Sequence, residues 1–380
     1  MKVEPFEMER FQSTWQNVVE YNLSDSGVRP LHFRDVLADE TTAARFLDYP
    51  VAYSQTNGTP ELRETIAGMY PGASARNVLV TNGSSEANFL VMWYLAQSGA
   101  TIVHTVPSYL QIWGLARTFG LRVHPLPLDE RRNWQFDPEH LKKAMARKPC
   151  AIAVCNPNNP TGAVIGPEER KALIDGARDA RAWLLSDEVF QGAERVGTHT
   201  RSLWDPDGKT VITNGLSKAY GLPGLRIGWI VGPEDLISSL WSHHDYTTIS
   251  PAFLSDRLAQ LALEPRRRKA ILRRTRAILR TNYGILERWI EGVYPELAYV
   301  PPTAGAICFL RYPFDLKSGE LAMRLIKEQS TLVVPGEHFG LDGYLRVCYG
   351  ASRDYLIVGL GRIAAFLKEL GSKGPRRRKG

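Results

Sequence analysis

The sequence feature that most constrains the fold is a short apolar run that leads into a loop with two Asn-Pro steps. Residues 150–155 (CAIAVC) carry no charged side chain, and residues 156–162 (NPNNPTG) follow directly. A continuous apolar run of this length is typical of a strand with both faces covered, as in a parallel sheet between helices. Each proline favours extended backbone at the preceding asparagine, so the chain turns where the strand ends. Because open α/β sheets bind ligands at the carboxyl ends of their strands, the sequence predicts an α/β fold with a site at 156–162.

Strand and helix patterns alternate on both sides of this run. The segments that favour strands are 78–81, 101–104, 182–187, 210–213, 227–231 and 307–310. The segments that favour helices are 83–95, 137–146, 167–180, 261–289 and a stretch that begins at 319. We expect four parts: an N-terminal arm with part of a small domain at 1–45, a large domain at 46–285, a C-terminal small domain at 286–372, and a basic tail at 373–380.

Composition and charge are those of an ordinary globular protein. The chain has 380 residues, of which 44% are hydrophobic and 23% are charged. Its net charge of +7 falls to +3 without the tail residues Arg376, Arg377, Arg378 and Lys379. There is no apolar signal segment and no run of about eighteen apolar residues, so we expect a cytoplasmic protein that does not cross a membrane. The four cysteines lack metal-ligand spacing, which predicts reduced core residues and no metal site.

One lysine, Lys218, lies between the strand pattern at 210–213 and a turn rich in glycine and proline. Arg226 follows eight residues later and opens the next apolar run. A sheet behind the turn can hold the lysine amine against a cofactor, and a nearby arginine can neutralise a bound phosphate. A lone lysine in a turn is most often a solvated surface charge. The pair together indicates a Schiff-base lysine and the anchor of its cofactor.

The string at 217–229, SKAYGLPGLRIGW, resembles the lysine motif of the class I/II aminotransferases, which are fold-type I enzymes that use pyridoxal 5'-phosphate (PLP). NPNNPTG and the strand that ends at Asp187 resemble further segments of that family, and the resemblance runs from Tyr53 to Arg346. It implies a large domain with a mainly parallel sheet and a smaller α/β domain built from both chain ends. It also implies a PLP-dependent aminotransferase that acts on an L-amino acid and a 2-oxo acid, as a homodimer with shared active sites.

The same resemblance assigns cofactor roles. Lys218 would carry PLP as a Schiff base and later act as the general base, while Asp187 would pair with the pyridine nitrogen and so let the ring accept electrons. Asn159 would donate to the phenolic oxygen. The other cofactor-binding candidates are Arg226, Ser84, Ser85 and Ser217 at the phosphate, Tyr109 stacked on the ring, and Tyr53, which would reach the phosphate of the neighbouring subunit. Four of these positions have plainer interpretations, since Ser84 and Ser85 could simply begin a helix, Tyr109 could be a core residue and Asp187 could cap a turn.

Substrate binding would involve both chain ends. Arg346 corresponds to the family residue that clamps the α-carboxylate of the substrate with two hydrogen bonds. Asp25, Ser26 and Gly27 lie in a segment that closes over the substrate in the family. This segment is acidic and rich in hydroxyl groups here, so Asp25 is expected either to cap the next helix or to meet a cationic substrate side chain.

Two positions depart from the family pattern. Phe190 stands where a tyrosine usually donates to the phenolic oxygen of the cofactor, and Gly215 stands where a serine usually helps to bind the phosphate. The missing hydroxyl at Phe190 removes a hydrogen bond that would favour the ionised phenolate. An alternative on the same scaffold is therefore a PLP-dependent elimination, cyclisation or oxidation of an amino acid, including a cationic one.

Two alternative interpretations would involve nucleic acid. Residues 264–280 are rich in arginine, and a PLP-binding transcription regulator would use the same scaffold beside a DNA-reading module. Apolar side chains recur among the arginines at helical spacing, which favours a solvated helix face. The roughly 45 residues before the core offer no helix-turn-helix of sufficient length. We therefore expect no nucleic-acid partner.

Overall fold

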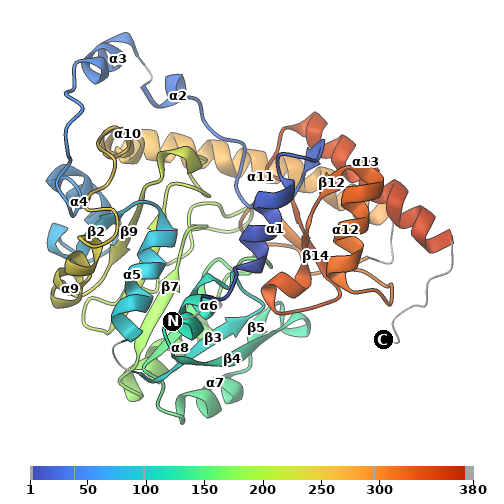
Figure 1. The fold of residues 1–380 in the computed structure, drawn as a ribbon, viewed down its shortest axis with the longest axis horizontal. Helices are drawn as coiled ribbons and strands as arrows, with labels where there is room; N and C mark the ends of the chain where they lie inside the picture. Colours follow the sequence, from blue (N-terminus) through green and yellow to red (C-terminus); the bar gives the residue numbers. More distant parts are fainter. Residues whose placement is uncertain (1–2, 38, 97–98, 294–296, 373–380) are drawn as a thin grey trace.

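A mixed sheet of eight strands forms the centre of the larger part of the molecule (Figure 1). The computed structural model describes residues 3–37, 39–96, 99–293 and 297–372. In spatial order the strands are β2 (Val78–Thr81), β9 (Gly228–Val231), β8 (Thr210–Gly215), β7 (Trp183–Asp187), β6 (Ala151–Cys155), β3 (Thr101–Val106), β4 (Arg122–Asp129) and β5 (Gln135–Phe136). Strands β8, β7, β6, β3 and β4 run parallel. Four of the seven strand pairings in this sheet are parallel, and three, β2–β9, β9–β8 and β4–β5, are antiparallel. The expected mainly parallel sheet is therefore confirmed.

Helices cover both faces of this sheet because successive side chains of a strand point to opposite sides. On β6, Ile152 and Val154 belong to one buried apolar cluster, whereas Ala151 and Ala153 belong to another. The first cluster is covered by α4 (Pro60–Ala67), α7 (Pro138–Met145), α8 (Pro167–Asp179) and α10 (Phe253–Leu263). The second is covered by α5 (Ser84–Ala96), α6 (Gln111–Thr118) and α9 (Glu234–His244). The continuous apolar run at 150–155 thus serves two cores.

The smaller part of the molecule combines the two chain ends. Its antiparallel sheet has the order β10 (Ala298–Tyr299), β11 (Ile307–Arg311), β14 (Tyr344–Cys348) and β13 (Val334–Pro335). Near the N-terminus, β1 (Tyr21–Asn22) pairs in parallel with β12 (Thr331–Leu332). Helices α12 (Ser318–Gln329) and α13 (Arg353–Ser372) pack beside these strands. This arrangement confirms a small α/β unit made from both ends.

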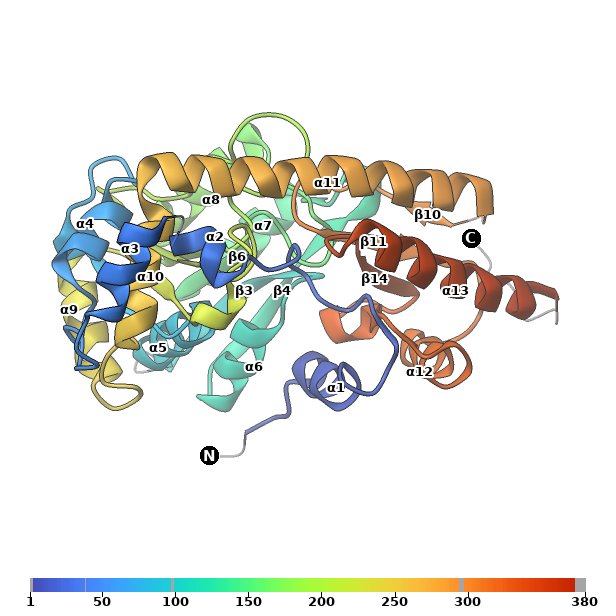
Figure 2. The same cartoon turned by 90° about the horizontal axis from the view of Figure 1, so that it is seen from above.

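One long helix, α11 (Pro265–Val293), runs beside both parts (Figure 2). The predicted domain boundary at 285/286 falls inside this helix, and the four-part division of the chain stays a prediction. Arg266, Arg273 and Arg280 are exposed on α11, whereas Leu279 and Leu286 are buried. The arginines therefore form a solvated face, as the apolar spacing predicted. The basic tail lies outside the described residues.

Short helices complete the chain. Three lie in the N-terminal segment, namely α1 (Glu7–Trp15), α2 (Phe33–Leu37) and α3 (Glu40–Leu47). Four are 3-10 turns, namely η1 (Ala75–Asn77), η2 (Glu130–Arg132), η3 (Pro223–Leu225) and η4 (Gly336–Phe339). Helix α1 lies between the large and small parts in Figure 1. This position matters for the site below.

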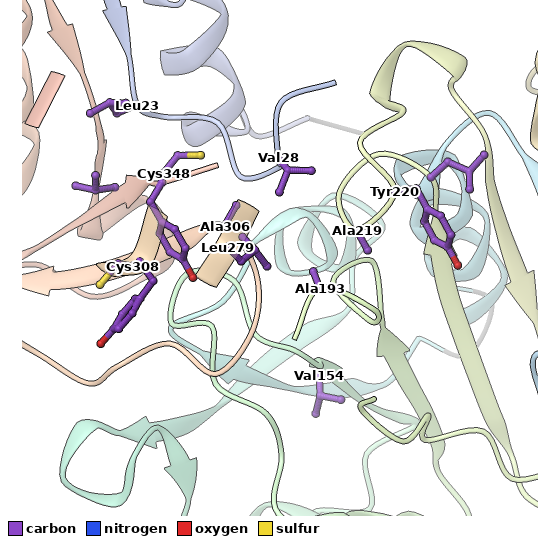
Figure 3. Close-up of a cluster of buried hydrophobic side chains, with 14 of the residues drawn as sticks. Leu23, Val28, Val154, Ala193, Ala219, Tyr220, Leu279, Ala306, Cys308 and Cys348 are labelled. Carbon is purple, nitrogen blue, oxygen red and sulfur yellow. The ribbon is translucent and has the colours of Figure 1, made fainter. Parts of the chain in front are cut away.

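A continuous apolar core joins the two parts. The larger buried cluster contains Val154 on β6, Leu279 on α11 and Cys348 on β14. Figure 3 shows part of it, with Val28 drawn between Ala306 and Ala219. Val28 belongs to the same cluster although it comes from the N-terminal segment. The N-terminal segment is therefore anchored in the core, beside the motif that carries Lys218.

The described residues contain no helix that combines the length and the apolar character needed to cross a bilayer. Across the same residues, no group of three His, Cys, Asp or Glu side chains is placed to hold a metal ion. All four cysteines are free thiols, and Cys155, Cys308 and Cys348 are buried. The predicted core position is confirmed for these three cysteines, whereas Cys150 is only partly buried.

Candidate active site

A cavity of about 590 Å³ opens where the parallel strands end. Two groups of residues line it. The strand-side residues are Ser84, Ser85, Tyr109, Gln111, Cys155, Asn159, Asp187, Val189, Phe190, Ser217, Lys218, Pro223 and Arg226. The arm-side residues are Phe6, Met8, Glu9, Gln12, Ser13, Gln16, Asn22, Asp25 and Ser26. Eleven of the fourteen site residues expected from the sequence line this cavity, and the exceptions are Gly27, Tyr53 and Arg346.

Asp187 lies at the carboxyl end of β7 and is only 4% exposed. Its Oδ2 accepts a hydrogen bond from Asn88 Nδ2 at 3.1 Å, and its Oδ1 accepts one from the Val189 N–H at 3.2 Å. Burial raises the pKa of the Asp187 carboxyl, although these hydrogen bonds and the charge of Lys218 oppose the rise. A buried carboxylate of this kind is stabilised by a cationic N–H group in the cavity.

Asn88 is a residue that the sequence interpretation missed. It lies on α5 and is fully buried, and besides donating to Asp187 it accepts a hydrogen bond from Thr213 Oγ1 at 2.8 Å. Asn88 therefore holds the Asp187 carboxylate in place from the neighbouring helix. No local signal identifies it, because an asparagine in the apolar stretch of α5 looks like an ordinary helix residue.

The predicted phosphate site is a compact group of donors at the N-terminus of α5. Arg226 has a left-handed backbone (φ 51°), and its Nη1 lies 3.4 Å from Ser217 Oγ. A side chain at Gly83 would overlap the Arg226 guanidinium, and one at Gly228 would overlap the Gly83 and Ser84 backbone. The guanidinium, the hydroxyl groups and the free N–H groups of a helix start form a site suited to a phosphate dianion.

Gly215 also has a structural explanation. It pairs with Gly228 across β8 and β9. A Cβ at Gly215 would lie 2.9 Å from the Ile227 carbonyl oxygen and 3.2 Å from Gly228 Cα. The two strands approach too closely here for a serine, so the serine expected from the family has no space in this chain.

The aromatic residues of the cavity differ in their surroundings. Tyr109 donates a hydrogen bond from its hydroxyl to Glu9 Oε1 at 3.0 Å, and Phe6 packs edge-on against its ring. Burial raises the pKa of the Tyr109 phenol, and the Glu9 carboxylate adds to the rise. Phe190 is 1% exposed and packs with Val189 and Ile307. It has no hydroxyl to offer the cavity, as the sequence already indicated.

Arg346 is buried on β14 behind the cavity wall. Its Nη1 donates to Asn159 Oδ1 at 2.9 Å, its Nη2 donates to the Ser24 carbonyl oxygen, and Met8 Sδ lies 3.9 Å away. Among the described residues, its Nε has no acceptor. Burial lowers the pKa of the guanidinium to about 10, so it stays charged at neutral pH. A buried cation with a free N–H is suited to binding a carboxylate, although Arg346 does not itself line the cavity.

The N-terminal segment places Asp25 beside the lysine. Asp25 Oδ1 lies 3.8 Å from Lys218 Nζ and accepts hydrogen bonds from the N–H groups of Ser26 at 2.6 Å and Gly27 at 3.3 Å. The prediction that Asp25 caps the next helix is wrong, because the next helix in the described chain after Asp25 is α2, which begins eight residues later at Phe33. Gly27 packs behind the lysine, where a Cβ would lie 3.4 Å from the Ser217 carbonyl oxygen.

Tyr53 lies outside the cavity and is 87% exposed. The sequence interpretation also missed most of the arm-side residues, including Glu9, Gln12 and Gln16. Apolar residues recur among polar ones at 6–19, but this pattern gives no sign that the polar side chains of α1 line a cavity.

These residues fit PLP. Arg226, Ser217 and the start of α5 match its phosphate, Asp187 matches a protonated ring nitrogen, and Asn159 matches the phenolic oxygen. Lys218 lies among them with its amine in the cavity. The glycines at 83 and 228 leave the space that the arginine needs at the phosphate end. The fold and the donor set together define a PLP-dependent enzyme of fold type I.

Comparisons with known proteins agree with this class. The family described as aminotransferase class I and II matches residues 51–363. The chain is 33% identical over 326 residues to capreomycidine synthase from Streptomyces vinaceus, which covers 85% of this chain and 82% of that protein. The structure is similar to a PLP-dependent aminotransferase from Streptococcus suis, with a TM-score of 0.91, 30% identity and coverage of 97% and 99%. It is also similar to the PLP-dependent cyclase OrfR, with a TM-score of 0.85, 27% identity and coverage of 97% and 98%.

The chain belongs to the class I and II aminotransferase family. It is a PLP-dependent aminotransferase that acts on an L-amino acid. The enzyme interpretation is confirmed, and the regulator alternative is not needed.

Proposed function

We propose that Lys218 is the catalytic base of this aminotransferase and that Asp187 and Arg346 orient the cofactor and the substrate. The observation that carries the proposal is the convergence of Lys218, Asp187, Asn159 and Arg226 on one cavity at the strand ends. When bound, PLP supplies an aldehyde that condenses with amines and a ring that accepts an electron pair. The roles of the protein residues follow from their positions.

The proton transfer is assigned to Lys218. Its Nζ would accept the proton of the substrate Cα–H and would then return that proton to a carbon of the cofactor, so that the proton moves between two carbon atoms. The Asp187 carboxylate would keep the pyridine nitrogen of bound PLP protonated, because a buried anion strongly favours a cationic partner. Arg346 would exchange its hydrogen bonds to Asn159 and Ser24 for the α-carboxylate of the substrate. This contact would present the Cα–H bond to the lysine.

Removal of the lysine amine tests this assignment. Lys218→Ala is expected to lower kcat by at least about three orders of magnitude, since it removes both the covalent anchor and the base. Borohydride treatment of the wild type followed by mass spectrometry should place the cofactor on Lys218, and the variant should take up none. Circular dichroism confirms that the variant is folded. Turnover near the wild-type rate in Lys218→Ala would refute the role.

A second candidate reaction is cyclisation, elimination or oxidation of the amino acid on the same scaffold. Phe190 favours this second reaction because it offers no hydrogen bond to the phenolic oxygen of the cofactor. The similarity to capreomycidine synthase and to a PLP-dependent cyclase favours it as well. Product analysis distinguishes the two. A 2-oxo acid formed together with the amine form of the cofactor supports transamination, whereas ammonia or a cyclic product supports the second reaction.

The assembly and the cellular location are also part of the proposal. A homodimer would bring the exposed Tyr53 of one subunit to the phosphate site of the other, which explains why Tyr53 lies outside the cavity of its own chain. The ordinary charge of the body and the free cysteines are consistent with a cytoplasmic protein.

A further inference from the structure

The arm-side residues give the cavity an acidic and polar wall. They include two carboxylates, Glu9 and Asp25, and no lysine, arginine or histidine. The apolar side chains among them are Phe6 and Met8, and the others are amides and hydroxyls. A wall of this composition is poorly suited to an aliphatic or aromatic substrate side chain, because several polar groups would lose water without gaining a partner.

Both carboxylates have an oxygen available for a ligand. Tyr109 donates to Oε1 of Glu9, and across the described residues nothing donates to Oε2. The Ser26 and Gly27 N–H groups donate to Oδ1 of Asp25, and the parts of the chain that the structure describes offer no donor to Oδ2. The side chain of Asp25 is 60% exposed toward the cavity and solvent. The surrounding cavity walls partly desolvate this carboxylate and oppose its ionisation, but the Lys218 charge and the two N–H groups outweigh that effect and lower its pKa.

A neutral acceptor lies beside them. Gln12 donates from Nε2 to the Ser24 carbonyl oxygen at 2.6 Å and to Ser24 Oγ at 3.0 Å. These bonds fix the amide, and none of the described residues donates a hydrogen bond to its Oε1. Asn22 Oδ1 accepts from Ser24 as well, which holds the same segment in place. The wall thus presents several fixed acceptors on the arm, opposite the strand ends.

The cationic side chains in and behind the cavity wall already have other roles in the proposed function. Arg226 belongs to the phosphate site, and Lys218 carries the cofactor in the proposed function. Arg346 lies behind Asn159 and is reserved for the α-carboxylate. Within the described chain, therefore, no cation remains on the arm side to pair with an acidic substrate side chain. Glu9 contacts Tyr109 and Asp25 contacts Lys218, so both carboxylates lie beside residues that the proposed function assigns to the cofactor.

We propose that the substrate is an α-amino acid with a cationic side chain, a guanidinium or an ammonium group, which Glu9 and Asp25 bind. This inference rests on the proposed function and adds the substrate class to it. A guanidinium has five N–H donors and an ammonium has three, and both match a wall of fixed acceptors. Long cationic side chains reach such carboxylates while their methylene groups pack on Phe6 and Met8.

The test compares amino acids that differ in charge and closely resemble each other in shape. The holoenzyme is titrated with arginine and with its neutral isostere citrulline, and separately with lysine and with norleucine, while the visible absorbance of the cofactor is followed. The cationic member of at least one pair is expected to bind at least about tenfold more tightly than the neutral member. The pair with the larger ratio shows whether the wall prefers a guanidinium or an ammonium group.

Variants of the two carboxylates test whether Glu9 and Asp25 cause the preference for a cationic substrate. Glu9→Gln and Asp25→Asn keep the shape of each side chain and are expected to reduce the arginine-to-citrulline ratio by about tenfold or to abolish it. Glu7→Gln is the control, because Glu7 lies on the same helix and outside the cavity lining. It removes an equal charge and should leave the ratio unchanged. Equal ratios in all three variants would overturn the proposal.

Three other outcomes are decisive. A holoenzyme that responds to neutral amino acids with a cation-to-neutral ratio near one overturns the substrate class and leaves the proposed function intact. A protein that takes up no cofactor overturns the proposed function. If Asp25→Asn changes the pH dependence of the cofactor absorbance but not the ratio, Asp25 serves only to position Lys218, and its part in the proposal fails.

Discussion

At the scale of single residues, the absence of side chains shapes the site as much as their presence. Gly83, Gly215 and Gly228 meet where β8, β9 and the start of α5 approach one another. They allow the Arg226 guanidinium to lie against the helix N-terminus, where a phosphate can be neutralised from two sides. Phe190 shows the complementary case, since its ring packs with Val189 and Ile307 and offers no hydroxyl group to the cavity.

The same substitution is expected to have opposite effects at two glycines. Gly228→Ala places a methyl group into the Gly83 and Ser84 backbone, so it should destabilise the protein by about 1–3 kcal/mol and weaken PLP binding. Gly361→Ala lies on an exposed face of α13 with open space around it and should stabilise the protein by about 0.5–1 kcal/mol. Urea unfolding and PLP titration measure both effects. Equal stability of the two variants would contradict the close packing at Gly228.

At the scale of elements, α11 holds a loop of the large part through one buried carboxylate. Glu194 has a side chain only 1% exposed, and it accepts hydrogen bonds from the Gly192 and Thr200 N–H groups at 2.9 Å and from Arg276 on α11. Burial opposes ionisation, but hydrogen bonds from His199, Thr200 and Gly192 outweigh it and lower the Glu194 pKa from 4.5 to about 2.

This depressed pKa gives Glu194 a defined pH dependence. Because the folded-state pKa is below the unfolded value of 4.5, its stabilisation is complete at neutral pH and is lost as the pH falls from about 4.5 toward 2. Glu194→Gln should therefore cost roughly 3 kcal/mol at pH 7, and the difference from the wild type should shrink in acid. Urea unfolding between pH 7 and about 3 measures it. Glu291→Gln, an exposed change on α11, is the control and should stay within about 0.5 kcal/mol.

At the scale of the whole molecule, one end of the large part exposes several large apolar side chains. Leu47, Val51, Tyr53 and Tyr246 are each more than four-fifths exposed. Helix α3, which ends at Leu47, and helix α9, which ends shortly before Tyr246, lie at the same end of the molecule in Figures 1 and 2. Exposed large apolar side chains are typical of a surface that another chain covers. In the proposed homodimer, a second copy of this chain would cover this surface.

Subunit mixing tests the shared site. Tyr53→Ala should weaken PLP binding about tenfold, because it removes a hydrogen bond to the phosphate of the partner subunit. After Tyr53→Ala and Lys218→Ala subunits are unfolded and refolded together, half of the dimers are mixed and one of their two sites is intact. Activity at limiting PLP should then return to about a quarter of the wild-type value. If the mixture is no more active than the separate variants, the sites are not shared.

The sequence by itself determined the local elements and the order of the motifs. Alternation of strand and helix patterns located β2, β6, β8 and α8 to within a few residues. The motif around Lys218 and Arg226 named the cofactor, because each of these signals lies within a short window of the chain. Local periodicity and backbone restrictions act over such windows, so they can be read without the fold.

Only the tertiary structure decided which distant residues meet. It placed Glu9 on Tyr109, Asp25 on Lys218 and Asn88 on Asp187, and it buried Arg346 behind Asn159. It also excluded Tyr53 from the cavity of its own chain. These contacts join segments that are far apart in sequence. Their geometry depends on how the sheets and helices pack, and no local pattern of residues contains that information.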